Sequence, residues 1–260
     1  MTTLKTYNPS VDELCMFLSK YSDRLFGSGA TCIRLVKNVS RIANAYGCNA
    51  EISIFPRHIH LMIMDQAGNI CTAVTSIQDR PADFALNTAL SKLSWNISDR
   101  EIDFQCAIRL FNRISNISRT SPTMELILVS LANASFCRLF GGDAMAMVVV
   151  FIATFAGYTA KQQLIARHTD FRITALICSF ISAVLAAGDI LFGFSSTPVI
   201  AIGTSILYLV PGIPFINSFC DMIDRHYICA MGRLMNAVVI TCCLSAGLCA
   251  GMYFMNIGMF

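Results

Sequence analysis

Charged residues are scarce in this chain: they make up 13% of its 260 residues, whereas 55% are hydrophobic and the mean hydropathy is +0.60. A soluble domain of this length carries about 25% charged residues. The shortage is uneven, because residues 1–120 hold 13 Lys and Arg and 10 Asp and Glu, whereas residues 121–260 hold 6 of each. We therefore predict a water-soluble α/β domain over 1–120 and a membrane-embedded domain over 121–260.

Other features are missing as well. No run of basic residues is present, so we expect no nucleic-acid partner. No C-x-x-C pair occurs among the 12 cysteines, which we interpret as small apolar side chains in a reducing compartment. We predict no metal and no cofactor. The first residues, MTTLKTYNPSVDEL, are polar and acidic, so an internal helix rather than a cleavable signal peptide is expected to direct insertion.

Apolar stretches in the second part are long enough to cross a bilayer. Five of them run for roughly 17–22 residues, near the ~20 that the hydrocarbon core requires. They cover residues 124–140, 144–160, 173–190, 198–219 and 234–254. The expected fold is a bundle of five transmembrane helices that follows an N-terminal cytosolic α/β domain.

The basic residues indicate an orientation for these spans. Of the 19 Lys and Arg, every one except Arg138 falls before the first span or in the loops after the second and fourth spans. Cytoplasmic loops carry an excess of Lys and Arg. We therefore predict a plasma (inner) membrane protein with a cytoplasmic N-terminus and an outside C-terminus.

Small residues recur at four-residue spacing within the spans, a pattern that permits close helix–helix packing in lipid. The pairs are Ala153 and Gly157, Ala183 and Ala187, and Gly247 and Gly251.

The N-terminal region is predicted to mix helices and strands. Ser10 and Glu13 form a capping-box pattern before a helix, and Ser98 and Glu101 form a second before a helix over 99–117. Between them, helices are expected near 14–25, 32–46 and 82–97. Strands are expected over 51–55, 58–64 and 69–77, where the period changes to two.

Candidate catalytic groups are few in this region. His58 and His60 alternate on one predicted strand and would point to the same face, but no Cys or carboxylate completes an obvious metal set. No nucleophile elbow or phosphate-binding loop is present. An enzyme is therefore a weaker interpretation than a transporter, and it stays open.

The fourth predicted span contains two prolines. Pro211 and Pro214 flank Gly212, and proline removes a backbone donor and clashes with the preceding turn. Unpaired carbonyls at membrane depth are tolerated only against protein or a water-filled cavity, and transporters direct such broken ends at a substrate. We therefore expect a broken helix here.

Polar residues accompany the break. Asn217 and Asp221, four residues apart, share a helix face, and Asp143 opens the second span. Ionisable groups at membrane depth usually face a cavity, where a raised pKa would let a carboxylate carry a proton. Three further charges are expected to lie in water at the span margins: Asp189, Asp224 and Arg225.

Four segments resemble the threonine/serine exporter family: LFGSGATCIRLVKNVSRIANAYG (25–47), SFCRLFGGD (135–143), LVPGIPFINSFCDMI (209–223) and GRLMNA (232–237). The P-G-x-P-x-I-N-x-x-x-D pattern from Pro211 to Asp221 is the most specific of them. The resemblance covers nearly the whole chain. The length and span count resemble the larger subunit of the split, two-component type.

The resemblance implies efflux driven by an ion gradient, together with a separate small multi-span membrane subunit. The substrate would be a small carboxylate-bearing metabolite, either a succinate-like dicarboxylate or threonine and serine. A higher oligomer is left open. The candidate pathway residues are Pro211, Gly212, Pro214, Asn217, Asp221, Asp143, Gly142 and Arg233.

No Lys or Arg lies deep in a predicted span. A substrate carboxylate would then depend on helix N-termini, backbone amides and the edge residues Arg138, Arg225 and Arg233. Two alternatives are a membrane-anchored cytosolic enzyme and a metabolite-sensing membrane protein, and sensing is compatible with export.

Overall fold

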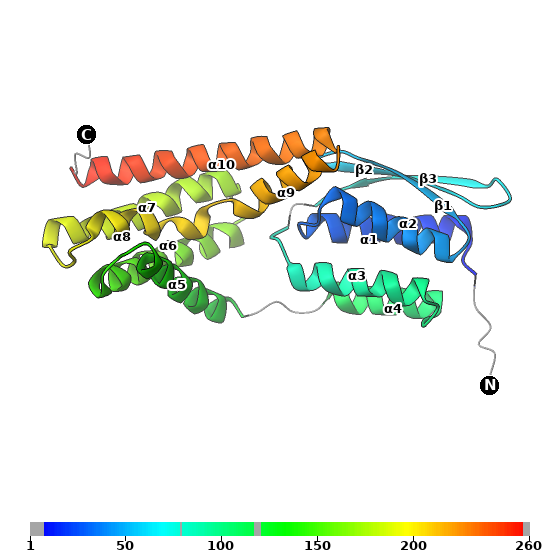
Figure 1. Cartoon of the computed structure of the whole chain (residues 1–260), viewed down its shortest axis with the longest axis horizontal. Helices are drawn as coiled ribbons and strands as arrows, with labels where there is room; N and C mark the ends of the chain where they lie inside the picture. The colour runs from blue at the N-terminus through cyan, green and yellow to red at the C-terminus, as the bar shows by residue number, and fades with distance from the viewer. Residues whose placement is uncertain (1–7, 79, 117–120, 257–260) are drawn as a thin grey trace. The chain divides into compact units, whose positions relative to one another are not determined.

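The computed structural model describes residues 8–78, 80–116 and 121–256, and Figure 1 labels its elements. The chain forms two compact units. Unit 1 comprises residues 1–118 and 213–235, and unit 2 comprises residues 119–212 and 236–260. The predicted boundary at residue 120 lies outside the described residues, and that prediction did not include the return of residues 213–235 to unit 1.

The N-terminal part of unit 1 mixes helices and strands. Its elements are α1 (Val11–Gly27), α2 (Cys32–Ala45), β1 (Asn49–Ile54), β2 (His58–Met64), β3 (Ile70–Ser76), α3 (Phe84–Ser98) and α4 (Phe104–Ser115). The Ser10–Glu13 capping box is confirmed, with the Glu13 N–H donating to Ser10 Oγ at 3.2 Å and the Ser10 N–H donating to Glu13 Oε2 at 3.0 Å. The three predicted strands are also present.

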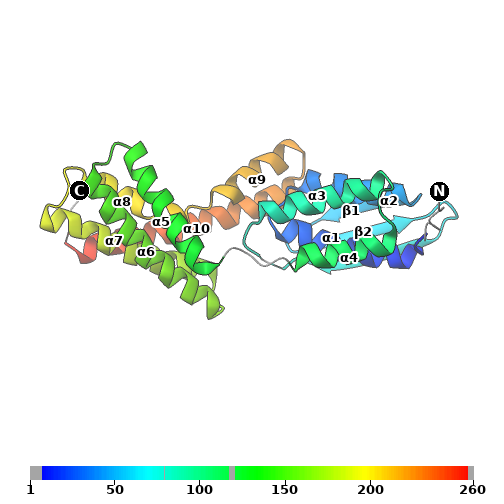
Figure 2. The ribbon, with the colours of Figure 1, turned by 90° about the horizontal axis from the view of Figure 1, so that it is seen from below.

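These strands form an antiparallel sheet in the order β1-β2-β3. Ala50 pairs with Ile63 and Ile52 pairs with Leu61, so apolar side chains gather on one face, as period-two alternation requires. Helices α1 and α2 cover that face, and α3 and α4 pack on their other side. Figures 1 and 2 show these three layers within unit 1.

The helix predicted over 99–117 is present but begins later, and the prediction that it starts at a Ser98–Glu101 capping box is wrong. Ser98 is the last residue of α3, and Arg100 has a positive φ of 55°, which an α-helix does not contain. The helix α4 begins at Phe104 after the N-cap Asp103. Because Ile97 is buried, α3 continues through it to Ser98, and residues 99–103 connect α3 to α4. Residue 117 lies outside the described residues.

Unit 2 is a bundle of helices. Its elements are α5 (Pro122–Leu139), α6 (Ala144–Ala166), α7 (Phe171–Phe192), α8 (Pro198–Ser205), the 3₁₀ turn η1 (Leu207–Leu209) and most of α10 (Tyr227–Phe254). The remaining helix, α9 (Gly212–Ile223), belongs almost entirely to unit 1.

Three helices within the described residues are long and apolar enough to cross a membrane: α6, α7 and α10. The pair formed by Pro198–Leu209 and Gly212–Ile223 is a further candidate, bent by 61°. The described residues therefore hold three candidate spans, or four with the bent pair, where the sequence predicted five. The predicted span that is not among these candidates is α5, because its 18 residues include the polar Glu125, Asn133 and Arg138.

The predicted close packing through small residues is confirmed between α10 and α7. A Cβ added to Gly251 would lie 2.8 Å from Ala183 Cβ, and one added to Gly247 would overlap Ser179 Oγ and the Leu176 carbonyl. Only glycine therefore allows these backbones to approach so closely.

Candidate functional site

The predicted interruption of the fourth span is present, and it begins before Pro211. Helix α8 ends at Ser205, and η1 precedes the start of α9 at Gly212. A proline ring collides with the carbonyl four residues earlier, here that of Leu207, so an α-helix cannot continue from Leu207 to Pro211. Val210 is accordingly extended, with φ −61° and ψ 126°, as the residue before a proline prefers.

Pro214 acts differently from the prediction. It is the third residue of α9, in the first turn, where a missing N–H costs no intrahelical hydrogen bond. Pro214 is therefore compatible with the start of the new helix, and Pro211 accounts for the extended Val210 that separates η1 from α9. Gly212 has no neighbouring atom within 4 Å of an added Cβ, so crowding does not require glycine there.

The break places a tyrosine against two helices of unit 2. Tyr208, in η1, shares a 3.0 Å hydrogen bond between its hydroxyl and that of Ser182, and its ring centroid lies 5.8 Å from that of Tyr158. A Cβ added to Gly157 would overlap both the Tyr208 and Ser182 hydroxyls. The absence of a side chain at Gly157 thus makes room for the polar contacts of the break.

A lysine lies beside this tyrosine. Lys161 Nζ is 4.9 Å from the Tyr158 ring centroid and 5.9 Å from that of Tyr208. The Tyr158 hydroxyl donates to Glu125 Oε1 at 2.6 Å. The predicted second span ended at residue 160, which put Lys161 in the loop after it, whereas α6 continues to Ala166. Lys161 therefore lies near the C-terminal end of α6 rather than in the loop that follows it.

An asparagine completes the hydrogen bonding of the broken helix. The buried Asn133 of α5 donates from Nδ2 to Thr154 Oγ1 at 2.7 Å and to the Thr204 carbonyl at 3.0 Å. Thr204 lies at the end of α8, where carbonyls lose their partners in the next turn. A polar Asn in an otherwise apolar run was the signal that could have identified this residue.

The predicted Gly142 and Asp143 form the turn between α5 and α6. An added Cβ on Gly142 would lie 2.9 Å from the Cys137 carbonyl oxygen, so the turn needs glycine. Asp143 caps α6, accepting from the Ala146 N–H at 2.7 Å and from the N–H and hydroxyl of Ser196 at 2.7 Å each. The Ala146 and Ser196 N–H groups hold the pKa of Asp143 below its usual value. Asp143 therefore stays ionised at neutral pH and is poorly suited to carry a proton.

Asp189 was predicted to lie in water, and this prediction is wrong. Its exposed fraction is 1%. It accepts hydrogen bonds from the N–H of Ser195, at 2.8 Å, and from the Ser195 hydroxyl. Asp224 and Arg225 are exposed, as predicted.

The most specific residues of the sequence pattern meet the N-terminal part of unit 1. The buried Asp221 carboxylate accepts from the Cys32 N–H at 2.8 Å and from Arg233 Nη1 at 2.8 Å. Cys32 is the first residue of α2, and the preceding Thr31 makes no side-chain cap. Asp221 thus supplies the negative charge that a helix N-terminus favours.

Two further contacts complete what we call the Asp221 clasp: Asn217, Asp221 and Arg233 with the backbone of Gly29, Ala30 and Cys32. Arg233 Nη2 donates to the Ala30 carbonyl at 2.7 Å, and Asn217 Nδ2 donates to the Gly29 carbonyl at 2.9 Å. The Arg233 guanidinium also lies 4.5 Å from the Phe26 ring centroid. The clasp fastens α9 and the start of α10 to the α1–α2 connection within unit 1.

The predicted site residues therefore do not form a single site but lie in three separate parts of the structure. The structure brings together Asn217, Asp221 and Arg233 in unit 1, and Gly142 and Asp143 at one turn of unit 2. Pro211 and Gly212 flank the break. Among the described residues, no three His, Cys, Asp or Glu side chains gather as metal ligands.

Comparison with known proteins identifies the family to which this chain belongs. The family described as "Putative threonine/serine exporter" matches residues 16–255. A "Probable succinate transporter subunit YjjP" of Klebsiella aerogenes is 26% identical over 252 residues, which cover 95% of each chain. The protein with the same description from Escherichia coli K12 is 26% identical over 242 residues, 92% of each chain. No solved structure matches.

Proposed function

Because this chain belongs to the threonine/serine exporter family, we propose that it is the larger subunit of a two-component secondary exporter. Its family and relatives are transporters, so it is a membrane exporter rather than an enzyme. The proposed substrate is a small carboxylate-bearing metabolite, with a succinate-like dicarboxylate ahead of threonine and serine, because both relatives are named for succinate.

One observation carries the proposal: the 61° break in an apolar segment that is otherwise long enough to span the membrane. Helix ends and bare carbonyls at membrane depth are tolerated where they line protein or a cavity. Broken helices of this kind form substrate sites in transporters. We place the solute route beside η1.

Lys161 supplies the charge that such a route needs. An ammonium group beside tyrosine rings is held by their negative faces, and it keeps its donors for an incoming carboxylate. Lys161 Nζ faces aromatic rings, the nearest being Tyr158 at 4.9 Å, and it is attracted by the Glu125 carboxylate that accepts from the Tyr158 hydroxyl. A charge-assisted hydrogen bond from Lys161 to a substrate carboxylate is therefore the proposed recognition contact.

The other predicted residues would support the route rather than touch the solute. Pro211 and Gly212 set the break, and Gly142 and Asp143 fix the α5–α6 turn. The Asp221 clasp, with Pro214 at the start of its helix, holds α9. Because Asp221 already has two hydrogen-bond partners, we assign it a positioning role.

The remaining part of the proposal concerns the assembly. The relatives are named as subunits, so we propose a separate small multi-span membrane partner for this chain. With α5 as a fifth span, the two termini would lie on opposite sides of the inner membrane. The distribution of Lys and Arg would place the N-terminus in the cytoplasm.

Efflux from loaded vesicles tests the function. The chain would be reconstituted with the proposed small membrane subunit, and loss of labelled succinate or threonine would be followed. We expect succinate efflux only when both subunits are present. Equal efflux from vesicles that lack this chain would contradict the proposal.

Lys161→Gln tests the recognition contact. We expect it to raise the KM for succinate at least tenfold, whereas Lys161→Arg should retain part of the affinity because the charge remains. The control is Arg167→Gln, which removes the same charge from the exposed C-cap residue that follows α6. Similar effects of the two Gln variants would remove Lys161 from the route.

A further inference from the structure

A groove between α2 and α3 carries uncompensated positive charge. Two adjoining hollows of about 650 Å³ and 480 Å³ share Lys37, Arg41 and Trp95 among their lining residues. Arg34 lines one hollow, and Arg100 lines the other. We call this surface the α2–α3 groove.

The charge pattern follows from the sequence of the two helices. Arg34, Lys37 and Arg41 lie three and four residues apart, so they share one face of α2 and extend over about 10 Å along its axis. Neither α2 nor α3 contains an Asp or Glu. No carboxylate lines either hollow among the described residues. These cations are therefore free to pair with an anion from solution.

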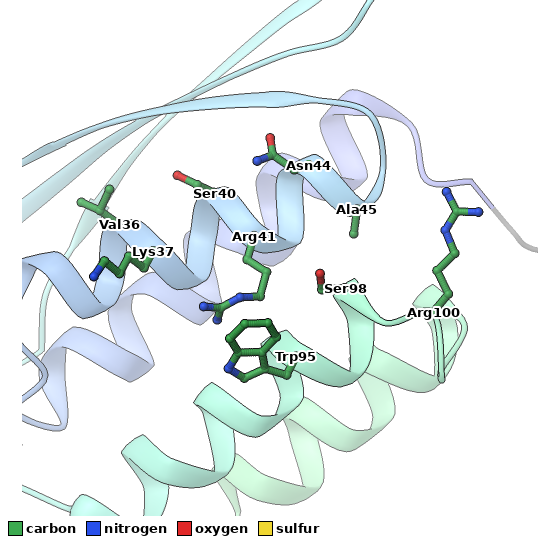
Figure 3. A pocket seen from close by; sticks show the side chains of 9 residues that line it. All are labelled: Val36, Lys37, Ser40, Arg41, Asn44, Ala45, Trp95, Ser98 and Arg100. Carbon is green, nitrogen blue, oxygen red and sulfur yellow. The ribbon is translucent and has the colours of Figure 1, made fainter.

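One of the cations is already positioned. The Arg41 guanidinium lies 3.7 Å from the Trp95 ring centroid, and its Nη1 donates to Asn38 Oδ1 at 2.9 Å and to Ser94 Oγ at 2.7 Å. Figure 3 shows Arg41 reaching from α2 to Trp95 on α3, with Lys37 one turn earlier on α2. A guanidinium held in this way loses little side-chain entropy when it binds an anion.

A further arginine, Arg100, lies at one end of the groove. Arg100 has φ 55°, a conformation that favours glycine or asparagine, and its side chain lies at one end of the hollow in Figure 3. On the α3 side, Ser98 adds a hydroxyl group, whereas the Ser91 hydroxyl already donates to the Asn87 carbonyl at 2.8 Å.

We propose that the α2–α3 groove binds a small organic anion that carries two or more carboxylate or phosphate groups. Two anionic groups several ångströms apart match cations spread along a helix face, and the hollow has the volume of a small-molecule site. The site lies within unit 1 and is separate from the route beside η1. The groove would thus give the exporter a place to sense a metabolite.

Binding in the α2–α3 groove can be followed by tryptophan fluorescence, because Trp95 lines the groove and is the single tryptophan of the chain. The purified full-length chain in detergent would be titrated with succinate, citrate and inorganic phosphate while Trp emission is followed. Acetate at equal ionic strength is the monoanion control. We expect a saturable change at millimolar concentrations with at least one of the three probes and none with acetate. The order of affinity would separate a carboxylate ligand from a phosphate ligand.

A matched pair of variants makes the test specific. Lys37→Gln should weaken binding at least tenfold, whereas Lys92→Gln, on α3 but outside both hollows, should leave it unchanged. Calorimetry on the same samples gives a second readout that does not depend on the Trp95 environment. No saturable response to any probe, or equal affinities for the two variants, would overturn the proposal. Neither measurement involves transport, so a failure of efflux would leave this result intact.

Discussion

The Asp221 clasp of unit 1 and the helix break of unit 2 stabilise their polar groups differently, although unit 2 also buries a carboxylate elsewhere, that of Asp189. In unit 1, the Asp221 carboxylate has an exposed fraction of 0% and pairs with Arg233 and the N-terminus of α2. In unit 2, the groups beside the helix break are the amide of Asn133 and the hydroxyls of Ser182 and Tyr208. Neutral hydrogen bonds contribute about 0.5–1.5 kcal/mol each, and bonds to charged groups contribute about 1.5–3 kcal/mol.

This difference indicates which connection is fixed and which is adjustable. Breaking a buried ion pair leaves an uncompensated charge, so the Asp221 clasp has no inexpensive alternative arrangement. Hydroxyl groups can exchange partners at little cost, because each both donates and accepts. We therefore expect α9 to stay attached to the α1–α2 connection while the contacts of Tyr208 change during transport.

The largest expected effect comes from removing one half of the clasp. Arg233→Ala should destabilise the protein by about 3–5 kcal/mol, because Asp221 would stay buried without its cation. The double variant Asp221→Ala/Arg233→Ala should lose less than the sum of the single variants, because the charges disappear together. Denaturant unfolding in detergent measures these free energies.

The control for the clasp is Asp224→Ala, which removes an exposed carboxylate one turn further along the chain. It should change the free energy of unfolding by no more than about 0.5 kcal/mol. If Arg233→Ala proved no more destabilising than this control, the clasp would not be the fixed connection of unit 1.

A smaller effect is expected from crowding the break. Gly157→Ala places a methyl group where the Tyr208 and Ser182 hydroxyls lie, which should cost about 1–3 kcal/mol and reduce succinate efflux. Gly203→Ala is the matched control, because no atom lies within 4 Å of its added Cβ. Unfolding and efflux measured on both variants test the comparison. Unchanged efflux from Gly157→Ala would show that the contacts of Tyr208 do not matter for transport.

Local patterns predicted much of the fold. Alternation identified the three strands, and the Ser10–Glu13 pair identified the start of α1, because both signals depend on neighbours within a few residues. The Ser98–Glu101 pair failed for the same reason, since the buried face of α3 determined where that helix ends. A local signal is reliable only where packing does not oppose it.

The partners within the site were harder to predict. The pattern from Pro211 to Asp221 identified the break and the residues around it, but Asp221 bonds to a backbone N–H that lies 189 residues away in the chain. The position of Lys161 in α6 was missed because the predicted span was ended at the first charged residue. A lysine whose side chain lies beside aromatic rings can remain within the helix. Both contacts depend on the tertiary structure.

The smallest expected effect concerns Asp143 of unit 2. Its carboxylate accepts from an N–H in the first turn of α6, as the Asp221 carboxylate does from the first N–H of α2. Its folded-state pKa is lowered by the Ala146 and Ser196 N–H groups, so the ionised form stabilises the folded chain. That stability is complete above the unfolded-state pKa of about 3.9 and is lost as the pH falls through the lower folded-state pKa. Asp143→Asn should therefore lower the melting temperature slightly at pH 7, and the difference from the parent should shrink toward pH 3. A difference that stays constant across this range would mean that the turn depends on the shape of the side chain rather than on its charge.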